Sequence, residues 1–434
     1  MTLSQGVMTI FSTRILTVAL SFITQIIIAR VLGPTGKGAY SLIILVPTLL
    51  VNLGNLGIGI SNTYFIGKKK YALNDIVSNS LISAIGFGIF FAGLFFLFLP
   101  WLKGFLLKGI NSLYLVIAVL SLPFAFLILY FEFILLGKER IKKYNLVPLI
   151  RSTSLVILIF LSLVIFKKGI GYAVSSWVFA TIVASILAFI LVAQNAKIKI
   201  SLNTKLLKDS IIFGSKGYLG NVIQLLNYRL DMFLVNFFMN VKFVGYYSVS
   251  VLLAETLWYF PGAVGTVLFP KVASVSSNVA NELTPKVCRI TLFFTLIFSL
   301  ILFLLSKIII SIFFGFRFLP ALSPLWILLP GIVILSIPKV LSNDLIGRGY
   351  PIINTYAAGA GLVTNILLNL IFIPKWGISG AAFASTIAYI LIAVIVIVAF
   401  KKITKNNIFD TLIIKKADFQ ILRNKLTMLF RNKG

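Results

Sequence analysis

Long runs of apolar residues, separated by short polar segments, follow one another along the chain. Each run holds about 20 residues or more, the length that an α-helix needs to cross the hydrocarbon core of a bilayer. The runs are too long and continuous for the alternating strands of a β-barrel, so their backbone groups must bond within helices. The pattern predicts an all-α integral membrane protein with about twelve spans: Met8–Leu32, Tyr40–Tyr64, Ile76–Leu99, Leu113–Leu136, Tyr144–Phe166, Tyr172–Val192, Ile211–Phe238, Val244–Phe269, Val287–Ile310, Leu319–Leu341, Ile352–Phe372 and Ile378–Phe400.

Composition supports this prediction and excludes several classes of protein. Of the 434 residues, 59% are hydrophobic and only 11% are charged, whereas soluble domains carry roughly 25% charged residues. Cys288 is the one cysteine, which excludes an intramolecular disulfide, and the absence of histidine excludes metal sites and proton relays built on that residue. The sequence has no P-loop, nucleotide-binding glycine pattern or metal-ligand cluster. We therefore expect neither a cofactor nor an enzymatic activity.

The net charge of +29 comes from lysines and arginines between the apolar runs, so we expect it to orient a membrane protein rather than bind nucleic acid. With the N-terminus inside, 24 basic residues fall on the cytoplasmic side. This asymmetry predicts that both termini are cytoplasmic. The outer loops then hold ten basic residues: Arg30, Lys37, Lys103, Lys108, Lys167, Lys168, Lys242, Lys307, Arg317 and Lys375.

Short motifs recur in the same order in the two halves of the chain, at offsets of 207, 208 and 210 residues. Since each half has six spans, both have the same orientation, as in parallel-repeat transporters. We predict a six-helix bundle at 1–193, a cytoplasmic linker at 194–209, a second bundle at 210–400 and a basic tail at 401–434. The paired motifs are Gly38–Ser41 with Gly245–Ser248, Lys167–Ile170 with Lys375–Ile378, and Leu136–Lys138 with Ile346–Arg348.

The segment Phe409–Arg431 alternates apolar and basic residues at roughly helical spacing. We expect an amphipathic helix on anionic lipid headgroups, with a solvated basic tail as the alternative.

Polar stripes mark the first span of each half. Arg14 and Gln25 lie on one helical face with Thr17 and Ser21, and the equivalent seventh span carries the set Lys216, Gln224, Asn227 and Asp231. We predict that both faces line one cavity between the bundles.

Four cations, Arg14, Arg151, Lys216 and Lys339, lie toward the cytoplasmic ends of their spans, on the order of 5–10 Å into the core. Such a cluster suits a phosphate or diphosphate headgroup. The alternative is that some of these side chains extend to the interface.

The embedded acids allow two interpretations. Glu255, near the middle of the eighth span, can form an ion pair with an arginine or bind a coupling ion. Asp231 and Glu132 have the same two roles open to them, and Glu132 lies near Lys138. In the second span, Asn52 and Asn55 offer neutral hydrogen bonds beside glycines that permit close packing or bending.

Several motifs resemble the signature of one transporter family. These are Arg30–Pro34, Gly38–Ser41, Gly54–Ile58, Tyr64–Gly67 and, in the second half, Asp231–Leu234, Gly245–Ser248 and Gly377–Ala382. The chain is similar over its length to the polysaccharide-type, Wzx-like flippases of the multidrug/oligosaccharidyl-lipid/polysaccharide (MOP) exporter superfamily. Residues Thr48 to Asn52 after Pro47 depart from the basic pattern of the lipid II branch.

The resemblance implies two six-helix bundles in the cytoplasmic (inner) membrane that work by alternating access. The implied substrate is an undecaprenyl-diphosphate-linked (or similar polyprenyl) oligosaccharide, such as an O-antigen repeat unit, moved from the inner to the outer leaflet. An ion gradient or the membrane potential supplies the drive, and membrane lipids, a glycan polymerase and other glycan-assembly proteins are the implied partners. A multidrug cation antiporter of the same superfamily and a lipid II flippase are the alternatives.

Overall fold

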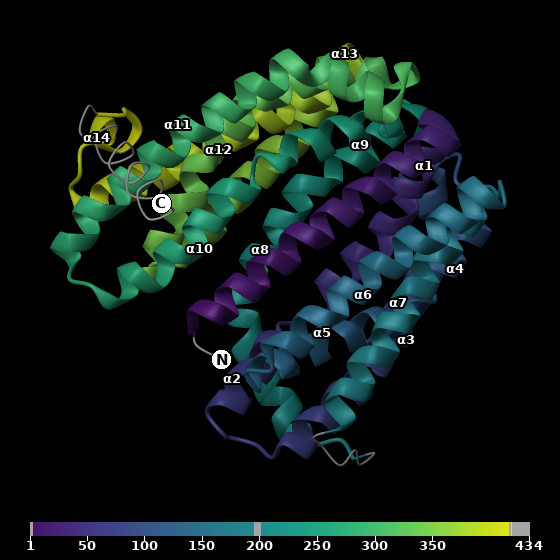
Figure 1. Ribbon diagram of the computed structural model, residues 1–434, viewed down its shortest axis with the longest axis horizontal. Coiled ribbons are helices and arrows are strands. Elements are labelled where there is room, and N and C mark those ends of the chain that lie inside the picture. Colours follow the sequence, from purple (N-terminus) through teal and green to yellow (C-terminus); the bar gives the residue numbers. More distant parts are fainter. Residues whose placement is uncertain (1–2, 195–200, 416–417, 419–434) are drawn as a thin grey trace, which may run out of the picture. The chain divides into compact units, whose positions relative to one another are not determined.

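The computed structural model describes residues 3–194, 201–415 and 418, with only the backbone described at 3–8, 216 and 217. These residues are helical almost throughout, and no strand occurs among them. The all-α fold class is confirmed (Figure 1). The chain divides into two compact units, residues 1–248 with 311–318 and residues 249–310 with 319–434.

The first unit is built on helix α5, which packs against α2, α3, α6 and α7, while α6 also packs against α1. Side chains such as Phe126, Tyr130 and Phe131 are fully buried in its core. The helices are α1 (Leu3–Gly54), α2 (Ile58–Gly67), α3 (Leu73–Gly104), α4 (Ser112–Val119), α5 (Leu122–Gly137), α6 (Ile141–Ile159) with the π-helix η1 (Phe160–Ile165), α7 (Ile170–Ala193), α8 (Thr204–Phe238) and the first half of α9 (Val241–Thr256).

Helix α1 contains the first predicted span and most of the second. Gly33 divides it with a left-handed backbone (φ 66°), a conformation that glycine adopts without strain. Pro34 follows at the first position of the new helix, where its missing N–H leaves no bond unmade. The helix therefore resumes at once, and the segment expected to be a loop between the first two spans is helical.

The signature residue Arg30 supports this end of the first unit. Its guanidinium donates from Nε to the carbonyl of Phe313 at 2.9 Å and from Nη2 to the carbonyl of Ile312. Both acceptors lie in the π-helix η2 (Ile310–Phe314), whose irregular backbone leaves carbonyls that need partners. Phe22 also meets Phe313 and Phe314 edge-on, with ring centroids 6.2 and 5.9 Å apart.

The second and eighth spans, which the repeat makes equivalent, are both interrupted. The second breaks at Asn55–Gly57 between α1 and α2, where Gly57 has a φ of 76°. The eighth breaks at Leu257–Trp258, where α9 and α10 (Tyr259–Ser274) meet at a bend of 43°. Discontinuous helices mark binding sites in many transporters because they expose backbone groups inside the membrane.

The N-terminal half of helix α8 and the residue before it bond to α3 and to the loop between α2 and α3. Asn203 and Asn79 exchange two hydrogen bonds, from Asn79 Nδ2 at 2.7 Å and from the Asn203 amide at 2.8 Å. Asp209 accepts from Lys70 at 2.8 Å and from the Tyr71 hydroxyl at 2.7 Å. These two bonds lower the pKa of Asp209, and the bond from Lys70 has the larger effect.

The second unit is built on α12, which packs against α10, α11 and α13. Gly377, with a φ of 58°, divides α13 into the eleventh and twelfth predicted spans. The helices are α10, α11 (Ser277–Ile309), the 3-10 helix η3 (Phe316–Ala321) at the junction with the first unit, α12 (Leu322–Gly347), α13 (Ile352–Thr404) and α14 (Ile408–Leu412).

Each predicted span coincides with a helix or a broken helix pair. In the described chain, eight helices are long and apolar enough to cross a membrane, or nine with the bent α9–α10 pair. Of these, α13 contains two spans and α1 contains the first and most of the second, while α8 carries the more polar seventh. Large apolar side chains such as Leu97 and Leu304 are 73% and 66% exposed, as expected of surfaces that face lipid tails. The chain is a multi-pass membrane protein.

Two boundaries remain predictions. Residues 195–200 of the expected linker lie outside the described residues, and α8 begins at Thr204, within the expected linker range. The compact units also place α8 with the first bundle, whereas the repeat groups it with the second. Of the predicted amphipathic tail, the described part contains the short α14, and residues 419–434 lie outside it.

Candidate functional site

Arg151, on α6, is a half-buried cation that side chains from three other helices of the first unit surround. Its guanidinium is half-buried, lies 5.5 Å from the ring centroid of Trp177 and donates from Nη2 to the Thr181 hydroxyl at 3.3 Å. Both partners belong to α7. Arg151 also interacts electrostatically with Glu132 on α5 and Tyr40 on α1. Four helices therefore fix one guanidinium in the interior of a membrane protein.

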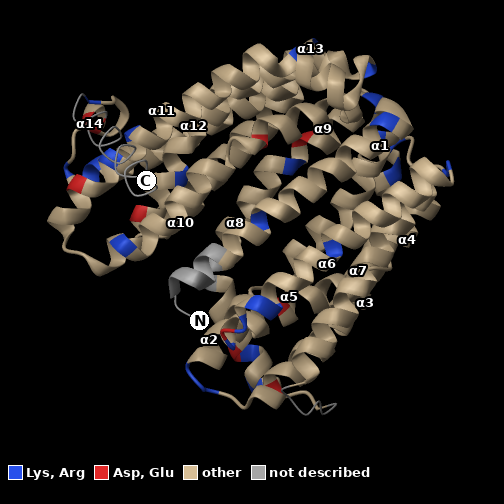
Figure 2. Ribbon diagram, in the orientation of Figure 1, with Lys and Arg blue, Asp and Glu red and all other residues tan. Residues whose placement is uncertain are grey.

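A row of polar side chains continues from Arg151 toward the start of α1. Glu132 interacts electrostatically with Arg151 and with Tyr144, and Tyr144 with Arg14. The described structure contains no ion pair between Glu132 and Lys138. Two of the four predicted cations, Arg14 and Arg151, are thus joined through Tyr144 and Glu132. Figure 2 shows how sparse charged residues are within the helices of this protein.

Gln25, the other predicted site residue of the first span, bonds to a lysine that the sequence analysis had assigned to an outer loop. Its Oε1 accepts a hydrogen bond of 2.6 Å from Lys37 Nζ, which also donates to the Ser41 hydroxyl at 3.0 Å. The expectation that Lys37 lies in an exposed outer loop is wrong, since its residue is only 3% exposed. The helix resumes at Pro34, so Lys37 lies in its first turns and is turned inward.

The asparagines of the second span hold the helix break together. Asn52 Nδ2 donates to the Thr48 carbonyl at 2.8 Å, and its own carbonyl accepts from the Tyr218 hydroxyl. Asn55 is buried, and its Oδ1 accepts from the Gly59 amide at 3.3 Å at the start of α2. The glycine-rich stretch is thus a bend stabilised by local amide bonds. A role of Asn52 and Asn55 in binding substrate remains a prediction.

The α8 stripe contains one unsatisfied amide. Asn227 is fully buried, and neither its Oδ1 nor its Nδ2 has a hydrogen-bond partner among the described residues. Such groups are rare, because an unmet buried amide is unfavourable. Nearby, Gln224 Nε2 donates to Tyr228 at 2.8 Å, and the buried Asp231 accepts from the Tyr247 hydroxyl at 2.6 Å. The side chain of Lys216 lies outside the described residues.

In the second unit, Lys339 on α12 lies beside the break of the eighth span. Its Nζ is 4.5 Å from the ring centroid of Trp258, which meets Tyr389 on α13 edge-on at 5.8 Å. Glu255 is half-buried in the last turn of α9, two residues before the break. A cation, an aromatic face and an acid therefore gather where the backbone is discontinuous.

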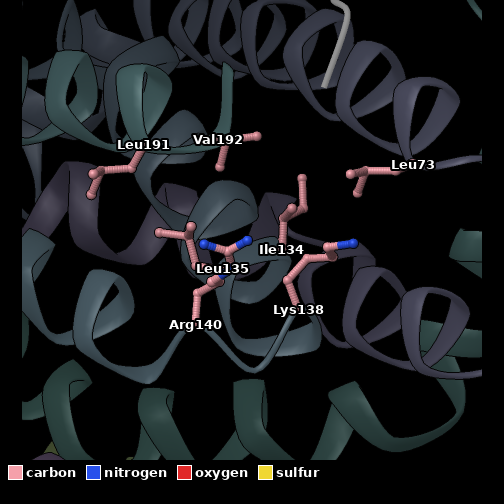
Figure 3. Close-up of a pocket in the computed structure, with 7 residues that line it drawn as sticks. All are labelled: Leu73, Ile134, Leu135, Lys138, Arg140, Leu191 and Val192. Carbon is pink, nitrogen blue, oxygen red and sulfur yellow. The ribbon is translucent and has the colours of Figure 1, made fainter. Parts of the chain in front are cut away.

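A small cavity of the first unit lies away from these residues. Figure 3 shows its lining, the apolar side chains of Leu73, Ile134, Leu135, Leu191 and Val192 with Lys138 and Arg140 beside them. These residues come from the start of α3, the end of α5 with the loop after it, and the end of α7. None of the predicted site residues contributes to this cavity.

Sequence reasoning missed the neutral and aromatic partners of the site. Tyr40 and Tyr144 link the charges, while Trp177 and Trp258 each lie against a cation. Apolar patterns include tyrosine and tryptophan as ordinary span residues, so nothing in the pattern singled these four out. For Lys37 the signal was present, because a proline after glycine is typical of a helix start.

Comparison with known proteins agrees with this architecture. The Polysaccharide biosynthesis protein family model matches residues 3–276, and the chain belongs to this family. It has the MOP-superfamily fold. The solved lipid II flippase MurJ, in an inward closed conformation, is 21% identical with a TM-score of 0.79, covering 97% of this chain and 91% of that one. An inward-facing multidrug resistance MATE transporter is 14% identical with a TM-score of 0.72, covering 92% and 98%.

Similar sequences occur in archaea. The chain is 26% identical to the uncharacterized membrane protein MJ1068 of Methanocaldococcus jannaschii over 290 residues, 64% of this chain and 57% of that one. It is 27% identical to the probable low-salt glycan biosynthesis flippase Agl15 of Haloferax volcanii over 169 residues, 37% of this chain and 35% of that one. These matches span little more than half of the first relative and about a third of the second. The family resemblance expected from the signature motifs is confirmed.

Proposed function

We propose that this protein is a flippase that moves a polyprenyl-diphosphate-linked oligosaccharide from the inner to the outer leaflet of the cytoplasmic membrane. The observation that carries the proposal is the half-buried Arg151 guanidinium, which four helices hold inside a member of the polysaccharide biosynthesis family. A planar guanidinium matches the oxygens of a phosphate, and its strength rises where water is excluded.

The remaining site residues have roles consistent with such a substrate. Arg14, at the opposite end of the row, adds positive charge toward the side from which we expect the headgroup to enter. The buried Asn227 amide lacks partners that a sugar hydroxyl can supply. Lys339 beside Trp258 provides a second cation next to an aromatic face, a surface on which sugar rings can stack. Glu255 and Asp231 remain candidates for coupling or for ion pairs.

Transport proceeds by alternating access of the two repeats, with both termini cytoplasmic. We infer no enzymatic step, because the substrate changes leaflet without a change in covalent bonds. The drive is an ion gradient or the membrane potential.

Flipping by the purified full chain in vesicles tests the proposal. The probe is a fluorescent short-chain polyprenyl diphosphate that carries N-acetylglucosamine, and leaflet exchange is followed by quenching from outside. We expect Arg151→Ala to slow exchange roughly tenfold or more, because a charge-assisted bond to phosphate is lost. Arg151→Lys should retain part of the rate, since charge survives without the bidentate geometry.

The exposed loop residue Lys69 offers a matched control, and Lys69→Ala should flip the probe at the wild-type rate. Uptake of organic cations without lipid flipping would instead identify a multidrug antiporter. Equal rates for the wild type and Arg151→Ala would remove the phosphate site from the proposal.

A further inference from the structure

Lys37 is a buried lysine that has no role in the proposed binding of phosphate at Arg151. It belongs to α1, four residues after the break at Gly33, and is 3% exposed. Its two hydrogen-bond partners, Gln25 Oε1 and Ser41 Oγ, are neutral. Among the described residues no carboxylate forms an ion pair with it. An ammonium group in such surroundings is unfavourable, because burial removes its hydration and no opposite charge replaces it.

The hydrogen bonds of Lys37 match a neutral amine. A –NH₃⁺ group has three N–H donors, whereas the uncharged –NH₂ has two. The structure provides two acceptors, at 2.6 and 3.0 Å. The neutral amine therefore satisfies both of its donors, while an ammonium would leave one N–H unsatisfied in the protein interior. Geometry and burial both favour the uncharged form when the site is empty.

The next turn of the same helix connects Lys37 to the phosphate site. Tyr40 is three residues further along α1 and interacts electrostatically with Arg151. On the other side, Gly38 packs against the backbone of Val241 and Gly245, and the charged residue in that turn of α9 is Lys242. The titratable groups around this turn are thus Tyr40, Lys242 and Arg151, with Glu132 beyond Arg151.

We propose that Lys37 is a protonatable counter-charge for the substrate headgroup, neutral in the empty site and protonated when a diphosphate binds beside Arg151. The inference rests on the proposed flippase function and deepens it. The step is the addition of one proton from water to the lone pair of Lys37 Nζ, with no change in any other bond. The third N–H of the resulting ammonium then has a phosphate oxygen to bond.

Thermodynamic linkage makes this coupling reciprocal. If an anion raises the proton affinity of Lys37, protonation of Lys37 raises the affinity for the anion by the same factor. Binding of the headgroup should therefore take up a proton, and affinity should fall as the pH rises. Lys37 then takes up a proton on the inside when the headgroup binds and gives it up on the outside when the headgroup is released. A pH gradient that is acidic outside therefore opposes export. The inside-negative membrane potential, which drives a net anion outward, is then the source of energy.

Proton uptake measured on the purified full chain tests the inference. The probe is farnesyl-diphosphate-linked N-acetylglucosamine, whose phosphates are diesters without a titrating proton near neutral pH. Binding is followed by calorimetry, and proton uptake by a pH indicator in weakly buffered solution. We expect the wild type and the exposed-site control Lys69→Met to take up about one proton for each bound probe.

The Lys37 variants should separate charge from protonation. Lys37→Met should take up no proton and bind roughly tenfold more weakly at the lowest pH, because a charge-assisted bond is absent. Lys37→Arg is charged at every accessible pH, so its affinity should not depend on pH and its binding should release or take up no proton. Thermal denaturation verifies that each variant is folded. If only one of Lys37→Met and Lys37→Arg folds, that variant alone can be compared with the wild type.

The outcomes distinguish a failure of the proposed flippase function from a failure of the proposed role of Lys37. A wild type that binds no probe overturns the proposed function itself. A wild type that binds without proton uptake, or a Lys37→Met variant that takes up the same proton, overturns the role of Lys37 and leaves the flippase proposal intact.

Discussion

Gly38 and Gly245, the equivalent glycines of the two repeated motifs, lie against each other's helices in the first unit. A methyl group at Gly38 would lie 1.9 Å from the carbonyl oxygen of Val241, and one at Gly245 would lie 1.9 Å from that of Pro34. Both obstacles are backbone atoms, which cannot move aside as a flexible side chain can. The close crossing of α1 and α9 thus explains why both copies of the motif begin with glycine.

The first prediction concerns this crossing. Gly38→Ala and Gly245→Ala should each lower stability by about 1–3 kcal/mol, the usual range for overpacking a close contact. Gly86 and Gly359, which have open space where a methyl would stand, provide helical controls. Alanine there should be neutral or slightly stabilising. Thermal denaturation in detergent measures both, and similar midpoints for all four variants would contradict the crossing.

The second prediction concerns the competition between Glu132 and substrate for Arg151. Because the carboxylate interacts with the guanidinium in the empty protein, its removal should leave Arg151 freer to bind phosphate. We expect Glu132→Gln to bind farnesyl-diphosphate-linked N-acetylglucosamine roughly threefold to tenfold more tightly. Glu139→Gln, at an exposed loop position, should not change the affinity. Weaker binding by Glu132→Gln would show that the pair supports the site instead.

The third prediction concerns the attachment of the C-terminal segment to α11. Arg289 donates to Asp418 from Nε at 2.5 Å and from Nη2 at 2.9 Å, and also to the carbonyl of Asp410. Bonding to Arg289, more than any other contact, holds the pKa of Asp418 below its ordinary value. The attachment is therefore fully present when the pH is above the ordinary aspartate pKa of about 3.9. It is lost as the pH falls through the lowered pKa of Asp418 in the folded protein.

Hydrogen exchange of α14, corrected for the intrinsic effect of pH, measures this attachment. We expect protection to persist from neutral pH to about 4 and to disappear in more acidic solution. Asp418→Asn should exchange severalfold faster even at neutral pH. Asp410→Asn is the control, since the Lys415–Asp410 ion pair is about half exposed on both sides and contributes little. Equal protection in both variants would argue against an anchoring role of Arg289.

The fourth prediction concerns topology. Lys69, Lys142 and Lys205 are exposed, and the asymmetry of basic residues places them in the cytoplasm. After Cys288 is replaced, cysteines at these three positions should resist an impermeant thiol reagent in intact cells. Lys168→Cys, on the opposite side, should react and serves as the positive control. Labelling of any cytoplasmic position before the cells are opened would reverse the orientation.

Much of the fold follows from local pattern. Apolar runs such as Ile76–Leu99 and Tyr172–Val192 coincide with α3 and α7 because lipid leaves the backbone no other partner than itself. The glycines of the second span left close packing and bending both open, and the chain does break at Gly57. Arg14 and Arg151 were recognisable as site candidates because a charge inside an apolar span is rare.

Other features were decided only in three dimensions. The sequence by itself determined a helical membrane protein with an internal repeat, because lipid imposes its rule on each segment separately. Which side chains meet depends on contacts between segments distant in the chain, such as Glu132 with Arg151 and Arg289 with Asp418. Lys37 shows the difference most clearly: its charge suggested an outer loop, but the backbone turn at Gly33 and the packing around it place the amine in the interior. Burial and hydrogen-bond partners are properties of packing, and spacing along one helix does not specify them.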